Sequence, residues 1–146
     1  MNANMQKLML DSLCNTLSSI MPRTVRQAKL VTAPSPWNGS QMGVSIGYAS
    51  PVSLRMVIDG ERDMFGRMGE MMFGMQLEGE MLDSCVGEMA NMLAGGTTTI
   101  LGGLGIATDI SPPLLLQSFD GEGRGVALPV EIEEVGSVRI MLLADE

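Results

Sequence analysis

Residues 80 to 96 place the strongest constraint on how this chain folds. At 3.6 residues per turn they form a helix with two different faces. One broad face is apolar and consists of Met81, Leu82, Cys85, Val86, Met89, Ala90 and Leu93. The opposite face carries Glu80, Ser84, Gly87, Glu88, Asn91 and Gly95. The apolar face predicts that this helix packs on a sheet or on another helix.

The polar face is unusual for a solvated helix surface, which normally carries several Lys, Arg and Glu residues. Glu88 and Asn91 are neighbours at spacing i,i+3. The nearby residues Ser84 and Gly87 are small and project little from the helix surface. This pattern favours a docking surface. From the residues alone, the alternative is that Glu88 and Asn91 are ordinary polar groups on a helix surface.

Several classes of chemistry are excluded by composition. The chain has no histidine, which removes His-based acid–base catalysis, triads with a His member and most transition-metal sites. The glycines at 102, 103 and 105 lack the Gly-Lys-Ser/Thr of a P-loop and indicate a tight connection instead. Catalysis would therefore use carboxylates, amides, hydroxyls or groups supplied by another protein.

The remaining elements are predicted from periodicity and from Pro and Gly signals. Predicted helices cover residues 3–21, ended by Pro22, and a stretch from Asp59 or Gly60 through Phe73, ended by Gly74. Predicted strands cover residues 24–33, 41–48, 52–58, 113–119, 125–133 and 137–144. Predicted loops and turns lie at 34–39, 49–51, 120–123 and 135–137, and Gly95-Gly96 is expected to cap the 80–96 helix.

Short turns between strands give antiparallel pairing. The expected fold is therefore α+β in two layers, with an antiparallel sheet of about five or six strands and helices packed on one face. Pro129 predicts that its strand lies at an edge or carries a bulge. At 146 residues the chain is expected to form a single domain, 1–146.

Charge and hydropathy limit the classes of partner that this chain can bind. The net charge is −8 and the nine basic residues are scattered, which argues against nucleic acid and against an anionic membrane surface. No apolar run approaches the roughly 20 residues of a membrane span, so a cytoplasmic protein with free thiols at Cys14 and Cys85 is expected. The 15 methionines fit either an interface between two subunits or a Met-rich core in a monomer.

The helix also carries the pattern Ser-x-x-x-Glu-x-x-Asn-x-x-x-Gly, formed here by Ser84, Glu88, Asn91 and Gly95. This pattern resembles the signature of the CheC–CheX–FliY phosphatases, which remove phosphate from the response regulator CheY. The order of the elements and Ile110-Ser-Pro-Pro after the helix look like the CheX branch. A short echo of residues 81–84 at 9–12 lacks the Glu-x-x-Asn spacing, so one site per chain is expected.

The resemblance implies specific roles. Asn91 and Glu88 would be catalytic: the Asn91 amide would orient a water for attack on an aspartyl phosphate, and Glu88 would pair with a lysine of the regulator. Ser84, Gly87, Glu88, Asn91 and Gly95 would form the partner-binding face. No cofactor is expected on this chain, Mg²⁺ is expected in the response regulator, and a homodimer is implied. The alternative is a non-catalytic dimeric module that binds a receiver domain or another signalling protein.

Overall fold

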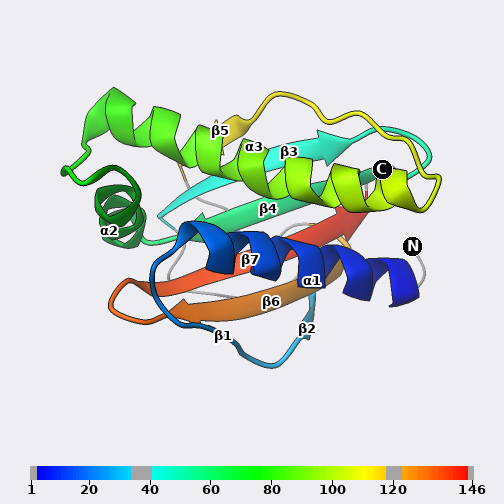
Figure 1. Ribbon diagram of the computed structural model, residues 1–146, viewed down its shortest axis with the longest axis horizontal. Helices are drawn as coiled ribbons and strands as arrows, with labels where there is room; N and C mark the ends of the chain where they lie inside the picture. Colours follow the sequence, from blue (N-terminus) through cyan, green and yellow to red (C-terminus); the bar gives the residue numbers. More distant parts are fainter. Residues whose placement is uncertain (1–2, 34–40, 118–122, 145–146) are drawn as a thin grey trace.

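The computed structural model describes residues 3–33, 41–117 and 123–144. Within these residues one antiparallel sheet of seven strands is covered on one face by helices (Figure 1). The predicted α+β class with two layers is confirmed, with more strands than the expected five or six. None of the helices in these ranges is both long enough and apolar enough to cross a membrane.

The elements follow each other in the order α1, β1–β4, α2, α3, β5–β7. The helices are α1 (Ala3–Ile20), α2 (Arg62–Phe73) and α3 (Gly79–Gly103). The strands are β1 (Val25–Gln27), β2 (Val31–Ala33), β3 (Met42–Tyr48), β4 (Leu54–Gly60), β5 (Leu114–Leu116), β6 (Gly125–Ile132) and β7 (Gly136–Ala144). Across the sheet the strand order is β1-β6-β7-β4-β3-β5, and β2 also pairs with β6.

The core lies between the helices and the sheet and is rich in methionine. Alternate residues of the central strands, such as Val44, Ile46 and Ile58, point into it because successive side chains of a strand face opposite ways. Fully buried methionines fill the space beneath the helices: Met9, Met42, Met56, Met64, Met68 and Met89. The free thiols of Cys14 and Cys85 are buried as well, and burial raises the pKa of Cys14 to about 11.

The strand predicted over 24–33 is divided into β1 and β2, which both pair with β6. Gln27 pairs with Val130 and Val31 pairs with Ala127, so three residues of one strand face two of the other. This is a bulge, and it occurs opposite Pro129, whose carbonyl accepts from the Ala28 N–H at 2.9 Å. Proline offers no N–H on this side, so the outer strand bends away. The prediction that the Pro129 strand lies at an edge or carries a bulge is therefore wrong: β6 lies between β1–β2 and β7, and the extra residue is in the outer strand.

The strand predicted over 113–119 has a different partner from the expected one. A short turn at 120–123 suggested pairing with the 125–133 strand, but β5 pairs with β3 at the other side of the sheet. Residues 118–122 and the predicted loop at 34–39 lie outside the described residues. As a consequence, β5 lies beside α3, the helix that carries Glu88 and Asn91.

The helix predicted from Asp59 begins later, because β4 continues through Gly60 and α2 starts at Arg62. Asp59 is fully buried and accepts two hydrogen bonds from Arg139, at 3.0 Å from Nε and 2.7 Å from Nη2. The pair lies on the face of the sheet away from the helices, next to a smaller apolar cluster that includes Val57 and Met141. Gly43 leaves room for the Asp59 side chain, since a Cβ there would lie 3.1 Å from the Asp59 Cβ.

Replacing Asp59 with Ala should lower the free energy of unfolding by about 3–5 kcal/mol, because it removes the carboxylate that a buried guanidinium binds. Exchange of both residues for apolar ones, Asp59→Leu with Arg139→Met, should recover most of that loss. Urea unfolding measures both effects. The control is Asp11→Ala, which breaks the exposed Lys7–Asp11 pair and should cost no more than about 0.5 kcal/mol. A similarly small loss for Asp59→Ala would contradict the structural role of the buried pair.

Candidate functional site on helix α3

Helix α3 is longer than the sequence predicted and continues through Gly95-Gly96 to Gly103. The expected C-cap at Gly95-Gly96 is therefore wrong. A Cβ at Gly96 would lie 2.7 Å from the Thr16 Oγ1, so this glycine allows α1 and α3 to cross closely. The Gly95-Gly96 pair predicts a helix end because Gly is common there. The contact with Thr16 that explains Gly96 joins distant segments and cannot be predicted from local sequence.

The rotation of α3 about its own axis is set by contacts on both sides. Thr97 is buried, and its hydroxyl lies 2.6 Å from the hydroxyl of Tyr48 on β3. Burial raises the pKa of Tyr48 to about 12, although the Thr97 hydrogen bond lowers it in part, so the phenol is neutral at physiological pH. Gly87 faces Pro113, whose Cγ would lie 3.5 Å from an added Cβ. With these positions held, residues 84, 88, 91 and 95 face outward.

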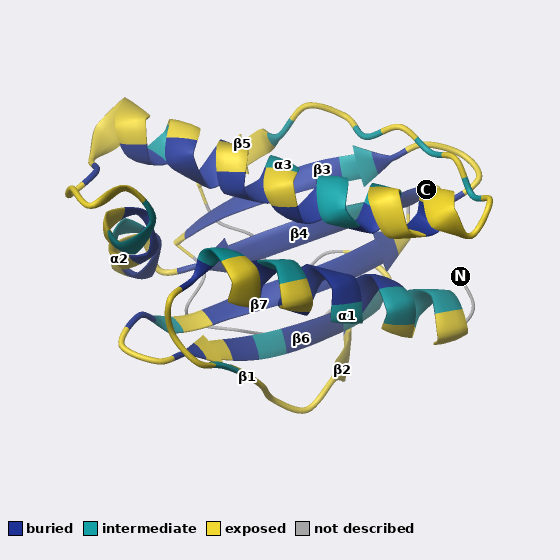
Figure 2. Cartoon of the chain, viewed as in Figure 1, coloured by how far each residue is buried: buried dark blue, intermediate teal, exposed yellow. Residues whose placement is uncertain are grey.

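Among the predicted site residues, Ser84 and Glu88 are exposed, and Asn91 and Gly95 are half-buried on the same side of the helix. The alternation of buried and exposed surface along α3 is visible in Figure 2. Within the described ranges, neither the Glu88 carboxylate nor the Asn91 amide has a hydrogen bond or ion pair. The two groups are therefore available to another molecule.

Gly87 is buried, although the sequence placed it on the open face. It is covered by Pro113 of the same chain, so a partner would meet Pro113 at this point and not the glycine. Pro113 and Leu115 form one wall of a groove of about 480 Å³ whose other wall includes Ser84 and Glu88. Sequence reasoning missed this wall, because it depends on the pairing of β5 with β3.

Met81 is also placed differently from the prediction, which put it on the buried face. Its side chain is 60% exposed, while the remaining members of the predicted apolar face are buried. Nearby on the helix, Asp83 binds Arg62 at 3.3 Å and also lines the groove that Ser84 and Glu88 border. The outward stripe of α3 therefore combines polar and apolar groups.

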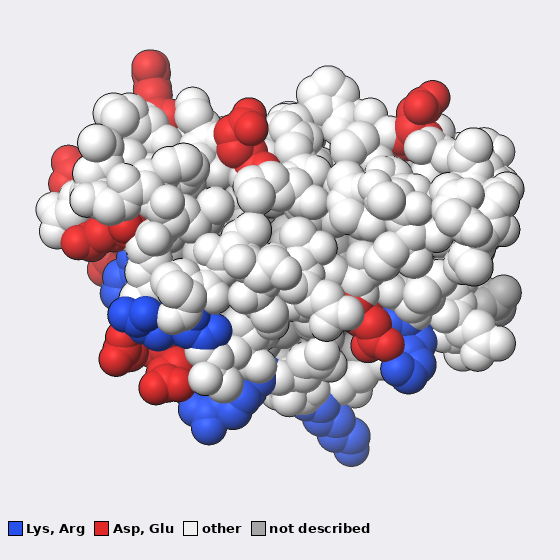
Figure 3. All heavy atoms as spheres, viewed as in Figure 1, with Lys and Arg blue, Asp and Glu red and all other residues white. Residues whose placement is uncertain are grey.

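The charges around the site are predominantly acidic. Glu78, Glu80, Asp83 and Glu88 all lie within the first turns of α3 or just before it. Figure 3 shows acidic side chains along the edge of the molecule above α3, while the opposite edge carries Lys and Arg together with some Asp and Glu. Within the ranges that the structure covers, no three His, Cys, Asp or Glu side chains form a group that could hold a metal ion. This surface suits a partner that presents a basic residue.

The echo of the motif in α1 does not produce a second surface of this kind. Ser12, the counterpart of Ser84, is buried at 3% exposure and has no hydrogen-bond partner for its hydroxyl within the described residues. Thr16, at the position that corresponds to Glu88, lies against Gly96 of α3. In the part of the chain that the structure covers, α1 therefore offers no second pair like the exposed Glu88 and half-buried Asn91.

The fold and this helix define a CheC-like domain, which three solved structures illustrate. A CheC-like superfamily protein from Shewanella sp. PV-4 is 22% identical, with a TM-score of 0.83 over 98% of both chains. CheX from Vibrio vulnificus is 22% identical, with a TM-score of 0.80 over 97% of this chain and 99% of that one. CheX in a CheX-CheY-BeF3-Mg+2 complex from Borrelia burgdorferi is 17% identical, with a TM-score of 0.77 over 97% of both chains.

Sequence comparison identifies the family. The model of the family described as chemotaxis phosphatase CheX matches residues 42–130, which is more than half of the chain. No curated protein matches the chain. The chain belongs to the CheX family of chemotaxis phosphatases, as the motif on α3 predicted.

Because Glu88 and Asn91 have no partners in the described chain, Glu88→Ala and Asn91→Ala should each change the free energy of unfolding by no more than about 0.5 kcal/mol. Gly95→Ala should stabilise the protein by roughly 0.5–1 kcal/mol, since Ala favours a helix interior and nothing lies within 4 Å of the added Cβ. Urea unfolding measures all three variants.

Gly96→Ala is the matched control for Gly95→Ala, and it should destabilise by about 1 kcal/mol or more because its Cβ meets Thr16. Combining it with Thr16→Ala should restore stability. A loss of several kcal/mol for Glu88→Ala or Asn91→Ala would mean that the pair is structural, and the catalytic interpretation would then be wrong.

Proposed function

We propose that this protein dephosphorylates a phosphorylated CheY-type receiver domain by positioning a water for attack on its aspartyl phosphate. The observation that carries the proposal is the pairing of Glu88 and Asn91, one helical turn apart, exposed or half-buried, with no partner in the described chain. Membership of the CheX family and the CheX-CheY complex formed by the Borrelia relative support it.

The chemistry asked of this chain is modest. An acyl phosphate is already reactive, and the receiver domain would supply Mg²⁺ and a lysine to neutralise the phosphoryl charge. What is missing is a water held in line with the phosphorus, and fixing its position lowers the barrier by removing translational and rotational freedom. A carboxamide suits this task because its N–H₂ donates to a phosphoryl oxygen while its C=O accepts from the water. Asn91 takes this role.

Glu88 takes the role of a docking residue. Its carboxylate is exposed and lies in an acidic surrounding, so it would pair with a basic group of the partner, the receiver's lysine. Such a pair sets the register of the helix against the receiver and brings Asn91 to the phosphate. Neither role requires a histidine or a metal ion bound by this chain.

Gly95 supports the reading of α3 as a contact surface. A glycine in the middle of a helix costs about 1 kcal/mol relative to alanine. Packing among the described residues does not explain this cost at Gly95, since none of their atoms lies within 4 Å of an added Cβ. An approaching partner gives such a reason, because its backbone could then come within contact distance of α3.

A non-catalytic dimeric module that binds a receiver domain is the second candidate. The observation that favours it is the amount of exposed apolar surface, with Leu114 at 61%, Met81 at 60% and Phe73 at 53%. The decay of a phosphorylated receiver domain with and without this protein separates the candidates. A binding module would leave the decay rate unchanged or slow it.

A homodimer formed through the sheet edges, with α3 of each subunit exposed, is part of the proposal. Both edges carry exposed apolar side chains, Leu30 and Val31 at β2 and Leu114 and Leu115 at β5. Light scattering at micromolar concentration should give twice the monomer mass. Leu30→Lys and Leu114→Lys should each leave folding intact, and the one at the interface should yield monomers. A monomeric wild type, or an interface that buries residues 84–91, would overturn this part.

Substitutions at the two site residues should have different kinetic effects. Glu88→Ala should chiefly weaken binding and raise KM for the phosphorylated receiver, while Asn91→Ala should lower kcat and largely spare complex formation. Asn91→Asp keeps the shape but removes the donor and sets a negative charge against the phosphate, so kcat should fall at least as far as with Ala. Stopped-flow decay of the phosphorylated receiver measures both parameters.

Gly95→Ala should raise KM while it stabilises the fold, because its methyl group stands between α3 and the partner. Leu104→Ala, at an exposed position near the end of α3, is the control and should leave both kinetic parameters unchanged. Full activity of Asn91→Ala in single-turnover dephosphorylation would refute the positioned-water mechanism, even with the family assignment unchanged.

A further inference from the structure

Three exposed apolar side chains gather where α2 passes into α3. Phe73 is the last residue of α2 and is 53% exposed, Met75 in the connecting loop is 53% exposed, and Met81 in the first turns of α3 is 60% exposed. Isolated exposed apolar residues are common on soluble domains, but a contiguous patch indicates an interaction surface. Here the three come from different segments and line one groove.

The groove has a volume of about 570 Å³, in the range of roughly 300–1,000 Å³ that is typical of binding pockets. Its apolar lining is completed by the buried residues Leu77 and Cys85. Burial raises the pKa of Cys85, so its thiol is neutral at physiological pH and acts as part of the apolar wall. We refer to this set, Phe73, Met75, Leu77, Met81 and Cys85, as the apolar groove.

The apolar groove is held in shape by the chain around it. Gly74 ends α2 in the left-handed conformation, at φ 74°, which turns the chain away from the helix axis. Leu77 then anchors the loop by packing against Gly69, where its Cδ1 would lie 3.0 Å from an added Cβ. Because Leu77 fixes the loop from inside, Phe73 and Met75 remain outside. The groove is therefore preformed.

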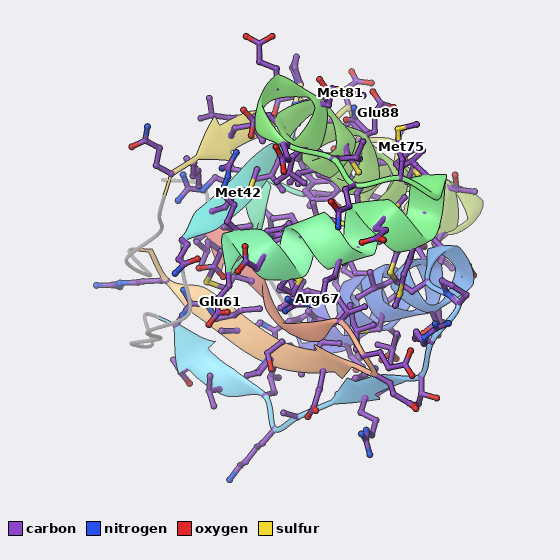
Figure 4. The ribbon with its side chains drawn as sticks, turned by 90° about the vertical axis from the view of Figure 1, so that its left-hand side faces the viewer. Met42, Glu61, Arg67, Met75, Met81 and Glu88 are labelled. Atoms are coloured by element: carbon purple, nitrogen blue, oxygen red, sulfur yellow. The ribbon has the colours of Figure 1, made fainter. Side chains whose placement is uncertain are left out.

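The apolar groove is continuous with the proposed site. Ser84 and Glu88 of the motif also line it, together with Glu80. Figure 4 shows Met75, Met81 and Glu88 on the same side of the molecule, around the beginning of α3. A molecule that contacts Glu88 is therefore next to the groove, and the polar and apolar parts of this surface would be used together.

The lining also indicates what chemistry the occupant has. Among the described residues that line the groove, the charged ones are Glu80 and Glu88, and none is basic. The methionine side chains are flexible and adapt to the shape of an apolar side chain, and Phe73 adds apolar surface. The complementary segment therefore combines one or more apolar side chains with an adjacent basic residue.

We infer that the apolar groove is the docking site for an apolar segment of the receiver domain that lies beside the lysine bound by Glu88. The inference rests on the proposed function and extends it. Glu88 and Asn91 address the phosphorylation site, while the groove supplies the binding energy and the preference for one receiver over another. A second copy of this chain in the groove is the competing occupant.

The test uses the full-length protein and the CheY-type receiver that the wild type dephosphorylates. Met81→Ser should raise KM for that phosphorylated receiver by about tenfold or more, with kcat changed less than twofold, since burial of a methionine is worth about that factor. Phe73→Ser and Met75→Ser should act in the same direction. Raising the salt concentration should weaken binding by wild type, because the rim of the groove is acidic.

Leu104→Ser is the matched control, because Leu104 is 62% exposed and does not line the groove. It should leave KM and kcat within twofold of wild type, and all four variants should retain wild-type unfolding midpoints. Wild-type KM with Met81→Ser and Phe73→Ser would overturn the inference and leave the proposed function standing. A change from dimer to monomer in these variants, seen by light scattering, would show that a second copy of the chain occupies the groove. This result would also overturn the inference. A wild type that accelerates the decay of no receiver would instead overturn the proposed function.

Discussion

The rotational setting of α3 on the sheet is the constraint on which the whole site depends. Each residue advances a helix by about 100°, so a turn of one residue position would bury Glu88 and expose part of the core. The Tyr48–Thr97 hydrogen bond, the crossing at Gly96 and the contact of Gly87 with Pro113 oppose such a turn from three directions. They come from β3, α1 and the segment before β5, so the site is a product of the whole fold.

Glycines within α3 show how this setting is obtained at some cost in helix stability. Gly96 and Gly87 have reasons inside the chain, since each faces another segment at close range. At Gly95, by contrast, no other described segment comes within 4 Å of an added Cβ. Under the proposed function the two adjacent glycines would serve different purposes, Gly96 in the crossing with α1 and Gly95 in contact with a partner. A helix designed only for stability would carry alanine at position 95.

Features that depend on local periodicity could be predicted from the sequence. The apolar face of α3, the β3–β4 hairpin and the alternation along β6 follow from spacing alone, and the motif residues were placed on one side of the helix apart from Gly87. Features that depend on distant segments could not be predicted. The pairing of β5 with β3, the burial of Asp59 against Arg139 and the covering of Gly87 each join residues far apart in the chain. Gly95-Gly96 misled for the same reason, because a helix crossing and a helix end use the same residue.

Among the differences between the sequence-based prediction and the structure, the exposure of Met81 bears most directly on function. Periodicity assigned it to the core, since methionine at its position continues the apolar face. The fold leaves it exposed because α2 ends at Phe73 and the Leu77 anchor turns the loop across the beginning of α3. The proposed positioning of water by Asn91 requires the receiver to be held in one orientation, and ordering two proteins costs several kcal/mol of translational and rotational free energy. A carboxylate on an exposed surface contributes too little to offset that cost. An apolar groove beside it contributes more, so Glu88, Asn91 and the apolar groove form one surface in the proposed complex.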